Sequence, residues 1–358
     1  MSVDDVRRRI DALDDELLDI LNRRAKLVRE VGKKKRDGSK AMHDPEREQQ
    51  IYERLEKKLG KARGAVFPVA SVRPVFREII SACLSLEEHL TVAYFGPPGT
   101  FTHMAARRTF GMSVRYSEGA TIPAVFDAVS TGEATYGVVP IENSTEGGVT
   151  HTHDCFLESR VMIRAEIVLD VSQCLIGRNE DLGRIERVYS HPQAIAQCRE
   201  WLAKHLPRAQ IVVSLSTASA ARDAAGDPAS AAIASQLAAE LNGLTVIREG
   251  IQDRNENATR FVVLGKTDAP PTGKDRTSIV FSTRDEQGAL RRVLEIFDAE
   301  KINLSRIESR PRRGERWQYV FFTDLEGHRL DPSITRALAR LETKCDMVRV
   351  LGSYPRVR

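Results

Sequence analysis

Apolar positions near the start of the chain recur at steps of three, four or seven residues, which is the spacing of one face of an α-helix. These positions are Val6, Ile10, Leu13, Leu17, Leu21, Val28 and Val31. No glycine or proline interrupts them before Gly32, so the pattern predicts one helix of about 30 residues and roughly 45 Å. Ser2 and Asp5 have the spacing of a capping box, which places the start of this helix.

Two more helices are predicted before residue 90. One begins where Asp44 can act as N-cap and Pro45 takes the first helical position. The other runs from about Pro74 to Glu87. Residues 1–90 are therefore predicted to form an all-α domain of three helices.

The pattern changes at residue 91, where short β-rich runs begin to alternate with helical stretches. The predicted strands are 91–95, 136–139, 188–189, 211–213 and 231–234. Almost every strand ends in a small hydroxyl or amide residue that can start a helix, which is typical of α/β units. Ligands bind at that edge of an open α/β sheet, where helix N-termini favour anions.

A polar, proline-rich linker at 268–274 precedes a third pattern. It predicts the order β (278–282), α (288–299), β (304–310), β (317–324), α (332–342), β (347–351). This order is that of a ferredoxin-like α+β sandwich. We therefore expect three domains, 1–90, 91–267 and 276–354.

Composition agrees with several soluble domains. The chain has 358 residues, 41% hydrophobic and 29% charged, which is more than one core usually organises. A net charge of +4 is modest, and the only basic run, 33–36, has no interleaved aromatics, so no nucleic-acid partner is expected. No apolar run approaches the roughly 20 residues that span a bilayer, and the N-terminus lacks the pattern of a signal peptide. We expect a cytoplasmic protein with no membrane partner.

Cysteine and histidine usage argues against redox or metal chemistry. The five cysteines are odd in number and contain no C-x-x-C pair, which favours reduced structural thiols. The run His151-Thr152-His153-Asp154-Cys155 has metal-binding residue types, but no fourth ligand lies nearby in the sequence. We expect no metal and no other cofactor.

The helical stretch carries several short motifs. They are Val6-Arg7, Ile10-Asp11-Ala12-Leu13-Asp14, Glu30-Val31-Gly32-Lys33 and Asp44-Pro45-Glu46-Arg47-Glu48. With them, residues 1–90 resemble the N-terminal domain of the all-helical chorismate mutases. The resemblance implies a substrate site formed by Arg7, Arg24, Lys35, Asp44, Arg47, Glu48, Cys83 and Glu87, with Arg24, Lys35 and Glu48 in catalytic roles. Chorismate carries two carboxylates, and its rearrangement needs positioning and charge complementarity rather than a covalent catalyst.

Helix geometry makes this site a shared one. Arg24 and Lys35 are 11 residues apart, a rotation of about 20° from the same helix face, so their side chains can converge. Arg7 lies about 25 Å before Arg24 along the axis, too far for one small ligand to touch both in one chain. We predict an intertwined homodimer or a higher homo-oligomer. The alternative is a helical dimerisation module whose charges are only solvated.

Four motifs occur in order through the α/β stretch. They are Gly96-Pro97-Pro98-Gly99-Thr100-Phe101, Val139-Pro140-Ile141-Glu142-Asn143-Ser144, Ser190-His191-Pro192-Gln193 and Asn257-Ala258-Thr259-Arg260-Phe261. This stretch resembles prephenate dehydratase, which implies two lobes like those of periplasmic binding proteins with the active site between them.

Prephenate loses its ring hydroxyl and CO₂ together, so the enzyme needs a proton donor and an anion clamp. We assign Thr259 as hydrogen-bond donor to the departing hydroxyl and Arg260 as the carboxylate partner. His191 is a candidate proton relay, or alternatively only holds a loop. The other expected contacts are Thr100, Glu142, Asn143, Ser144, Ser190, Gln193, Thr217, Ser219 and Phe261.

The C-terminal stretch resembles an ACT domain through Gly288-Ala289-Leu290 and Glu308-Ser309-Arg310-Pro311. In dehydratases these segments bind phenylalanine. The implied effector site comprises Gly288, Ala289, Leu290, Asn303, Leu304, Glu308, Ser309, Arg310 and Pro311. The alternative is a domain that only dimerises.

Together the three resemblances imply an enzyme that acts on chorismate and prephenate, releases phenylpyruvate and is inhibited by L-phenylalanine. Two alternatives remain open at this point. One is a dehydratase that prefers arogenate, which differs from prephenate by an amino group. The other is a non-catalytic amino-acid-binding regulator, since the two-lobed architecture is shared with non-enzymes.

Overall fold

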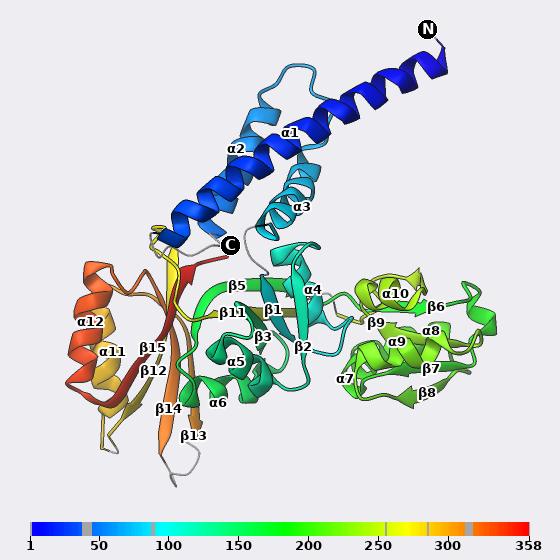
Figure 1. Ribbon diagram of the computed structural model, residues 1–358. Helices are drawn as coiled ribbons and strands as arrows, with labels where there is room; N and C mark the ends of the chain where they lie inside the picture. Colours follow the sequence, from blue (N-terminus) through cyan, green and yellow to red (C-terminus); the bar gives the residue numbers. More distant parts are fainter. Residues whose placement is uncertain are drawn as a thin grey trace. The chain divides into compact units, whose positions relative to one another are not determined.

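The structure is a computed structural model that describes residues 2–37, 45–86, 90–254, 256–284, 286–311 and 318–357, without the side chains of 33–37, 45 and 46. The chain divides into two compact units. The first is Met1–Thr91 with Arg107–Arg115, and the second is Val92–Ala106 with Tyr116–Arg358. Figure 1 labels most of the helices and strands of both.

The first unit confirms the three predicted helices. They are α1 (Val3–Asp37), α2 (Pro45–Gly60) and α3 (Val72–Leu84), the last preceded by the 3₁₀ turn η1 (Val69–Ser71). The predicted capping box is present, because the Asp5 amide donates to Ser2 Oγ at 3.2 Å and the Ser2 amide donates back to the Asp5 carboxylate at 2.9 Å. The helix passes through Gly32 and ends at Asp37, so it has 35 residues where about 30 were predicted.

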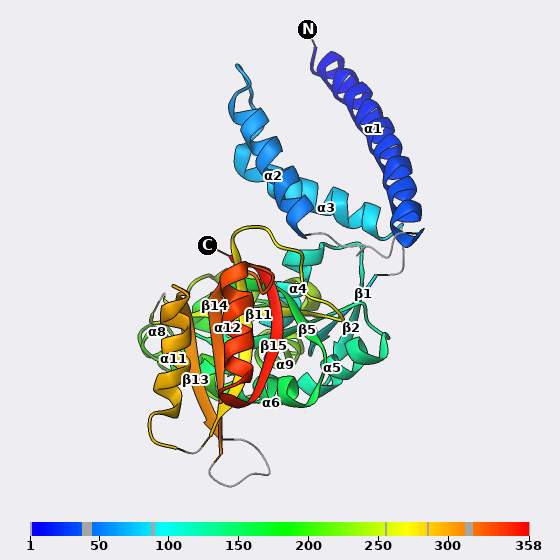
Figure 2. The same cartoon turned by 90° about the vertical axis from the view of Figure 1, so that its left-hand side faces the viewer.

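The helix α3 contacts both other helices of this unit. Arg73 joins it to α2 through Glu56 at 2.6 Å, and Cys83 accepts a hydrogen bond from Arg24 of α1. Figure 2 shows α1 as a long rod with α2 and α3 on one side of it. Much of the apolar surface of α1 is exposed in the single chain, at Val3, Val6, Ile10, Leu13, Leu17, Leu18, Ile20, Leu27 and Val31.

The second unit contains two α/β lobes and a C-terminal domain. The first lobe has the sheet order β2-β1-β3-β11-β5, with β4 beside β3. Its strands are β1 (Thr91–Phe95), β2 (Arg115–Gly119), β3 (Tyr136–Asn143), β4 (Gly147–Gly148), β5 (Met162–Asp170) and β11 (Ala258–Gly265). Its helices are α4 (Phe101–Phe110), α5 (Ile122–Thr131) and α6 (Thr150–Glu158). Strand β11 runs antiparallel between β3 and β5.

The second lobe has the sheet order β10-β6-β9-β7-β8. Its strands are β6 (Cys174–Gly177), β7 (Arg187–Ser190), β8 (Gln210–Val213), β9 (Ser230–Ala234) and β10 (Thr245–Arg248). Its helices are α7 (Pro192–Gln197), α8 (Arg199–His205), α9 (Thr217–Ala225) and α10 (Gln236–Asn242), with a 3₁₀ turn η2 (Leu182–Arg184). The chain crosses between lobes twice, and the crossings lie side by side because the Val171 amide donates to the Asn257 carbonyl at 2.8 Å.

The predicted strand, turn and helix units are confirmed after β1, β7, β8 and β9, but the prediction of a helix start after β3 is wrong. Strand β3 continues through Pro140 to Asn143 and turns into β4. The backbone there is already committed to a sheet, since Asn143 pairs with Thr259 of β11.

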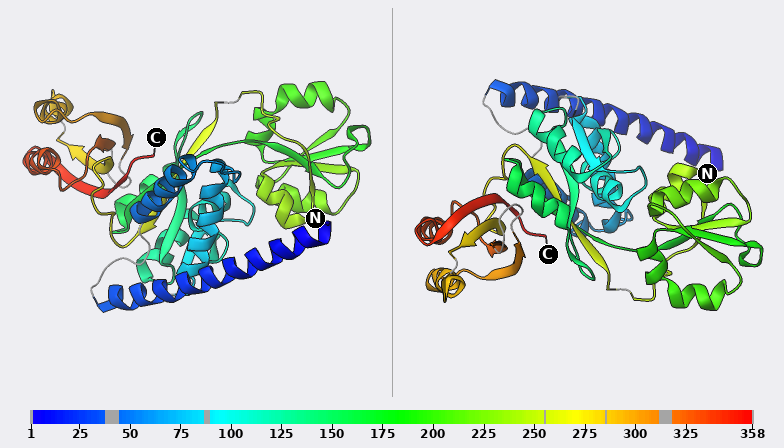
Figure 3. Two further views of the ribbon diagram at one scale, coloured as in Figure 1. Left: turned by 90° about the horizontal axis from the view of Figure 1, so that it is seen from above. Right: turned by 90° about the horizontal axis from the view of Figure 1, so that it is seen from below.

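The C-terminal domain confirms the predicted βαββαβ order. It consists of β12 (Asp275–Thr283), α11 (Ala289–Ala299), β13 (Leu304–Pro311), β14 (Tyr319–Glu326), α12 (Pro332–Glu342) and β15 (Cys345–Pro355), in the sheet order β13-β14-β12-β15. Figure 3 shows α11 and α12 together on one face of this sheet.

Alternating residues of β12 divide between two cores. Ile279 and Phe281 pack with α11 and α12. Val280 belongs to a different cluster, which contains Phe322 of β14 together with Phe126 and other core residues of the first lobe. The C-terminal sheet and the first lobe therefore share one hydrophobic core. Among the residues that the structure describes, no helix is long and apolar enough to cross a membrane.

Candidate active sites

A cavity of about 350 Å³ lies between the two lobes of the second unit. Residues from strand ends and helix starts of both lobes line it, as expected for an open α/β sheet. Of the residues predicted for the dehydratase site, it is lined by Thr100, Asn143, His191, Gln193, Thr217, Thr259 and Phe261.

The Thr259 hydroxyl has a fixed orientation in this cavity. Asn143 Nδ2 donates to Thr259 Oγ1 at 2.8 Å and to Asn257 Oδ1 at 2.9 Å. The other end of the Asn143 amide is also held, because Asn143 Oδ1 accepts from the Thr145 hydroxyl at 2.6 Å and from the Thr145 amide at 3.0 Å. Thr259 Oγ1 is thus an acceptor toward Asn143, which leaves its own proton available to a ligand.

Helices from both lobes begin at the cavity. Thr100 precedes α4, and its Oγ1 accepts from the His103 amide at 3.3 Å. Thr217 opens α9, which is capped by Ser216 through a reciprocal pair with Ser219. The first backbone N–H groups of a helix and its dipole favour a negative charge.

His191 acts as a cap in the structure. Its Nδ1 accepts from the Gln193 amide at 3.3 Å and so begins α7. This contact supports the loop-holding alternative for His191, because the Nδ1 lone pair is already used. The other ring nitrogen is the only one left to meet a ligand.

Three predicted hydroxyl contacts are used for the fold instead. Ser190 is fully buried, and its Oγ donates to the Ile233 carbonyl at 2.8 Å. Ser219 belongs to the cap of α9, and Ser144 Oγ donates to the Glu256 carbonyl at 3.0 Å. None of the three lines the cavity.

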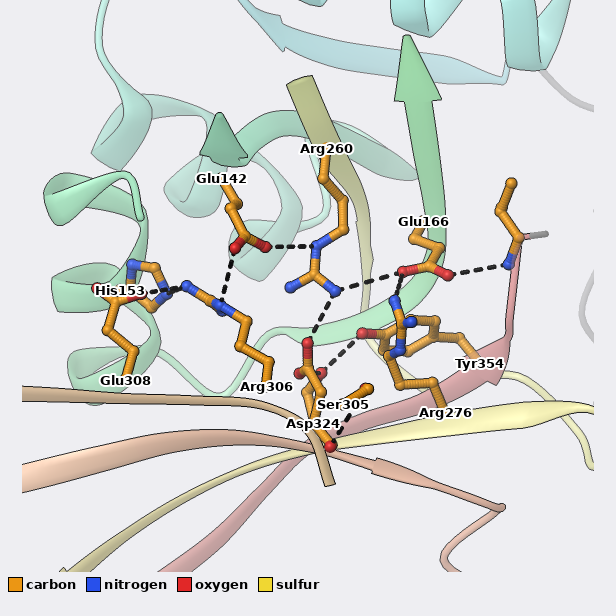
Figure 4. A network of polar contacts seen from close by, with 12 residues as sticks. Glu142, His153, Glu166, Arg260, Arg276, Ser305, Arg306, Glu308, Asp324 and Tyr354 are labelled. Carbon is orange, nitrogen blue, oxygen red and sulfur yellow. Dashed lines mark hydrogen bonds and ion pairs between the residues drawn. The ribbon is translucent and has the colours of Figure 1, made fainter. Parts of the chain in front are cut away.

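The structure corrects the prediction for Arg260. Side chains alternate across a strand, so Thr259 and Phe261 face the cavity and Arg260 faces the opposite side of β11. There its Nη1 lies 2.7 Å from Asp324 Oδ2, and its Nε lies 3.3 Å from Glu142 Oε2 (Figure 4). Glu142, expected in the cavity wall, also belongs to this ionic cluster.

Burial penalises the charge on Asp324, but Arg260 and a hydrogen bond from Ser278 outweigh it and hold the pKa of this carboxyl below its ordinary value. Burial likewise opposes the charge on Arg260, yet the surrounding carboxylates raise its pKa. Both groups are therefore charged at neutral pH, and Arg260 is already neutralised before any substrate binds.

Several cavity residues were missed by sequence reasoning. Gln173 and Asn257 lie on the two crossings between the lobes. Gln197 Oε1 accepts a hydrogen bond from Gln173 Nε2 at 3.1 Å. Gln173 is 3% exposed, and its Oε1 has no hydrogen-bond partner within the described part of the chain. Asn257 was recognisable from its place two residues before Thr259. No comparable sequence signal marked Gln173.

A larger cavity of about 520 Å³ lies beside α5 and α6, and none of the predicted residues that the structure describes lines it. It has charged residues of both signs, including Asp127, Glu158, Arg160 and Lys266. Among the residues that the structure describes, none from the first lobe's sequence motifs lines this larger cavity. We therefore place the chemistry in the smaller cavity.

In the first unit, the structure brings together two of the predicted mutase residues. Arg24 Nη1 donates to Cys83 Sγ at 2.8 Å. Glu48 on α2 accepts from Tyr52 at 3.5 Å, and Arg47 is exposed on the same helix. Arg7 is exposed near Asp4 at 3.6 Å. Asp44, Glu87 and the side chain of Lys35 lie outside the described residues.

The predicted effector residues lie at two places in the C-terminal domain. Gly288 precedes α11 with φ of 76°, and Ala289 and Leu290 form its first turn. The remaining residues are Asn303, just before β13, and Leu304, Glu308, Ser309, Arg310 and Pro311 within it.

On β13 the side chains alternate between two directions. Glu308 contacts Arg306 and Arg310 lies 3.8 Å from Asp154 of the first lobe, whereas Ser309 and Pro311 are exposed. Part of the predicted effector segment therefore faces the first lobe.

Three family models match successive parts of the chain. They are chorismate mutase type II over residues 6–88, prephenate dehydratase over 92–269 and the ACT domain over 277–343. The bifunctional chorismate mutase/prephenate dehydratase of Aquifex aeolicus is 46% identical over 352 residues, which cover 98% of this chain and 97% of that protein.

Solved structures resemble the part without the helical unit. A prephenate dehydratase from Arthrobacter aurescens in complex with L-Phe is 37% identical, with a TM-score of 0.69 over 75% of this chain and 90% of that one. A quorum-quenching acylase, GqqA, has the same TM-score at 31% identity, over 75% of this chain and 98% of that one. With every domain matched in order and a relative similar over nearly its whole length, the chain belongs to the bifunctional chorismate mutase/prephenate dehydratase family.

Proposed function

We propose that the second unit converts prephenate to phenylpyruvate in the cavity between its lobes, with Thr259 as the donor to the departing ring hydroxyl. The hydrogen bond from Asn143 Nδ2 to Thr259 Oγ1 supports this most directly. It occupies an acceptor position of the hydroxyl and leaves the proton for the leaving group. An alcohol is too weak an acid to ionise, so Thr259 stabilises or relays rather than supplies a strong acid.

The rest of the cavity offers helix N-termini for a carboxylate and apolar surface for a small ring. Among the described residues that line it, none is a lysine or an arginine. We therefore assign the retained carboxylate to the backbone N–H groups at the starts of α4 and α9 in place of Arg260. Phe101 and Phe261 supply apolar surface for the ring. Aromatisation drives the loss of CO₂, so no covalent catalyst is required.

Substitution of Thr259 by alanine tests the assignment. Loss of one preorganised donor costs about 2.7–4 kcal/mol, so dehydratase kcat should fall about 10²- to 10³-fold. Mutase turnover, measured as chorismate loss in the same preparation, should not change. A dehydratase rate close to that of the parent chain would overturn the role of Thr259.

We assign the mutase reaction to the first unit. Arg24 and its neighbour Cys83 are the part of the site that a single chain contains. The exposed apolar residues of α1 and the distance between Arg7 and Arg24 together favour a homodimer in which each site takes Arg7 from the second chain.

Mixing two variants tests this sharing. Arg7→Ala and Arg24→Ala should each lose mutase activity alone. Refolded together, half of the dimers are mixed, and one of the two sites in each has both arginines, so about one quarter of the parent activity should return. No recovery on mixing would show that each site is formed within one chain.

The C-terminal domain is assigned to phenylalanine sensing. Its ACT family match and the L-Phe named with the Arthrobacter structure support this role. Inhibition of phenylpyruvate formation by phenylalanine, with unchanged kinetics as the contrary result, is the direct test. Comparing kcat/KM for prephenate and arogenate separates the two substrate preferences.

A further inference from the structure

A buried ionic cluster joins the first lobe to the C-terminal sheet (Figure 4). Its members come from six strands of the second unit. They are Glu142 of β3, Glu166 of β5, Arg260 of β11, Arg276 of β12, Arg306 and Glu308 of β13, and Asp324 of β14.

Arg260 stands at the centre of this cluster. Besides Asp324 at 2.7 Å and Glu142 at 3.3 Å, its Nη1 lies 3.5 Å from Glu166 Oε2. Asp324 is 2% exposed, and its other carboxylate oxygen accepts from Ser278 at 2.5 Å. Buried charges of this kind hold their partners in place, since separating them leaves a charge without compensation. The cluster therefore fixes the back of β11 to the C-terminal sheet.

Two members of the cluster are chain neighbours of the residues that define the donor geometry. Arg260 follows Thr259 on β11, and Glu142 precedes Asn143 on β3. Neither charged side chain lines the cavity, while both neighbours do. A displacement of either charged group would turn the strand and change the Asn143–Thr259 hydrogen bond on its other face.

The far end of the cluster reaches the predicted effector segment. Arg306 lies 3.4 Å from Glu142 and also contacts Glu308, which belongs to the Glu308–Pro311 segment. The Glu308 carboxylate packs against Gly148 of β4, so closely that a Cβ on this glycine would overlap it. Strand β4 pairs with β3 at Glu142. One end of the cluster is thus at the edge strand of the C-terminal domain and the other is behind Thr259.

We propose that Arg260 is a positioning residue that holds Thr259 through its ion pair with Asp324, and that the cluster couples phenylalanine binding on the C-terminal domain to the dehydratase cavity. This inference rests on the proposed function of both sites. Phenylalanine need only favour one arrangement of β13 to bias the cavity, because an effector acts through its different affinity for two states.

Two substitutions, Asp324→Asn and Arg306→Gln, test whether the cluster couples phenylalanine binding to the cavity or only holds the C-terminal sheet against the first lobe. Asp324→Asn should lower dehydratase kcat at least about fivefold with KM within about twofold, because it disturbs the donor without touching the lining of the cavity. Arg306→Gln leaves in place both the Arg260–Asp324 pair and the contact of Arg260 with Glu142, so Glu142 stays behind Asn143 and kcat should be kept. In both variants phenylalanine should still bind by calorimetry, while its inhibition weakens at least about fivefold, the lower end of usual allosteric couplings.

Asp268→Asn is the matched control. The buried Asp268 side chain pairs with the partly exposed Arg329 of the C-terminal domain at 2.8 Å, but neither residue belongs to the cluster. This variant should keep both kcat and inhibition. Inhibition of parent strength in Arg306→Gln, equal loss in Asp268→Asn, or loss of phenylalanine binding itself in the cluster variants would each overturn the inference.

The folded state is checked by thermal unfolding, and Arg306→Gln decides the matter if Asp324→Asn does not fold. A parent chain without prephenate turnover, or without phenylalanine binding, would instead refute the proposed function and the inference that rests on it. The two failures are therefore distinguishable in one set of measurements.

Discussion

The direction of the Asn143–Thr259 hydrogen bond can be reversed by one isosteric change. In Asn143→Asp the Nδ2 donor becomes an oxygen, so the Thr259 hydroxyl, 2.8 Å away, turns to donate to the carboxylate. The proton that we assign to the leaving group is then occupied. Asn257 Oδ1, 2.9 Å from the same atom, loses its donor as well.

The size of the effect follows from the strength of the competing bond. A hydrogen bond to a charged acceptor is worth about 1.5–3 kcal/mol, which the substrate must overcome to recover the hydroxyl proton. At 1.36 kcal/mol per factor of ten, dehydratase kcat should fall about 10- to 150-fold. The new negative charge should also raise KM for a dianionic substrate.

Measurement of phenylpyruvate formation at saturating prephenate separates kcat from KM. Because a protonated aspartic acid can donate again, the kcat of Asn143→Asp should rise as pH falls toward about 4, whereas that of the parent chain should not. Thr145→Val, which removes a partner of Asn143 Oδ1 and leaves the Nδ2 bond, is the control and should lose much less activity. A kcat of Asn143→Asp equal to that of the parent at neutral pH would refute the reasoning.

Three further outcomes can be checked independently. Gly352→Ala should destabilise the second unit by about 2–5 kcal/mol in denaturant melts, because φ is 153° and a Cβ would overlap the Ile163 backbone; an unchanged midpoint would contradict this. Burial first, and Arg306 next, lower the pKa of His153 to about 3, so the native state resists a proton that the unfolded chain takes up near pH 6.5. The stability that this group contributes should therefore fall by about 1.4 kcal/mol between pH 7.5 and 5.5, and a His153→Gln variant that shows the same acid sensitivity would exclude His153 as the cause. Arg24→Met should abolish mutase turnover and spare phenylpyruvate formation from prephenate, and retained chorismate consumption would remove Arg24 from the site.

His153 illustrates why burial rather than residue type decides a role. Its Nδ1 donates to the Val149 carbonyl at 2.9 Å, since a carbonyl can only accept, and its Nε2 lies 3.2 Å from Arg306 Nη2. Both nitrogens are therefore used by the neutral ring. The His-Thr-His-Asp-Cys run offered metal-binding residue types, but sequence spacing could not show that its second histidine points into the interface with the C-terminal sheet.

Local signals were sufficient for most of the architecture. The cap at Ser2, the small hydroxyl residues expected after the strands and the period of the apolar residues predicted where helices begin. In the structure, Ser216 and Ser235 are two of these hydroxyl caps, and all such contacts involve residues close in sequence. The position of Gln173 in the cavity could not be predicted in this way. It depends on two chain crossings about 80 residues apart being brought side by side, which is a tertiary contact.

Alternation along β11 accounts for Arg260, but the failure at Glu142 has a more specific cause, a β-bulge in β3. Pro140 lines the cavity, so strict alternation along β3 would turn Glu142 into the cavity and Asn143 away from it. Between Arg260 and Phe261 the pairing of β11 with β3 shifts by one residue, with Glu142 opposite Arg260 and Pro140 opposite Phe261. The extra residue puts Glu142 on the back of the sheet beside Arg260 and brings Asn143 to the front beside Thr259. One irregularity thus places both the Asn143–Thr259 pair on the front of the sheet and the Glu142–Arg260 pair on its back. A substitution on either face of these two strands should therefore change the geometry on the other face.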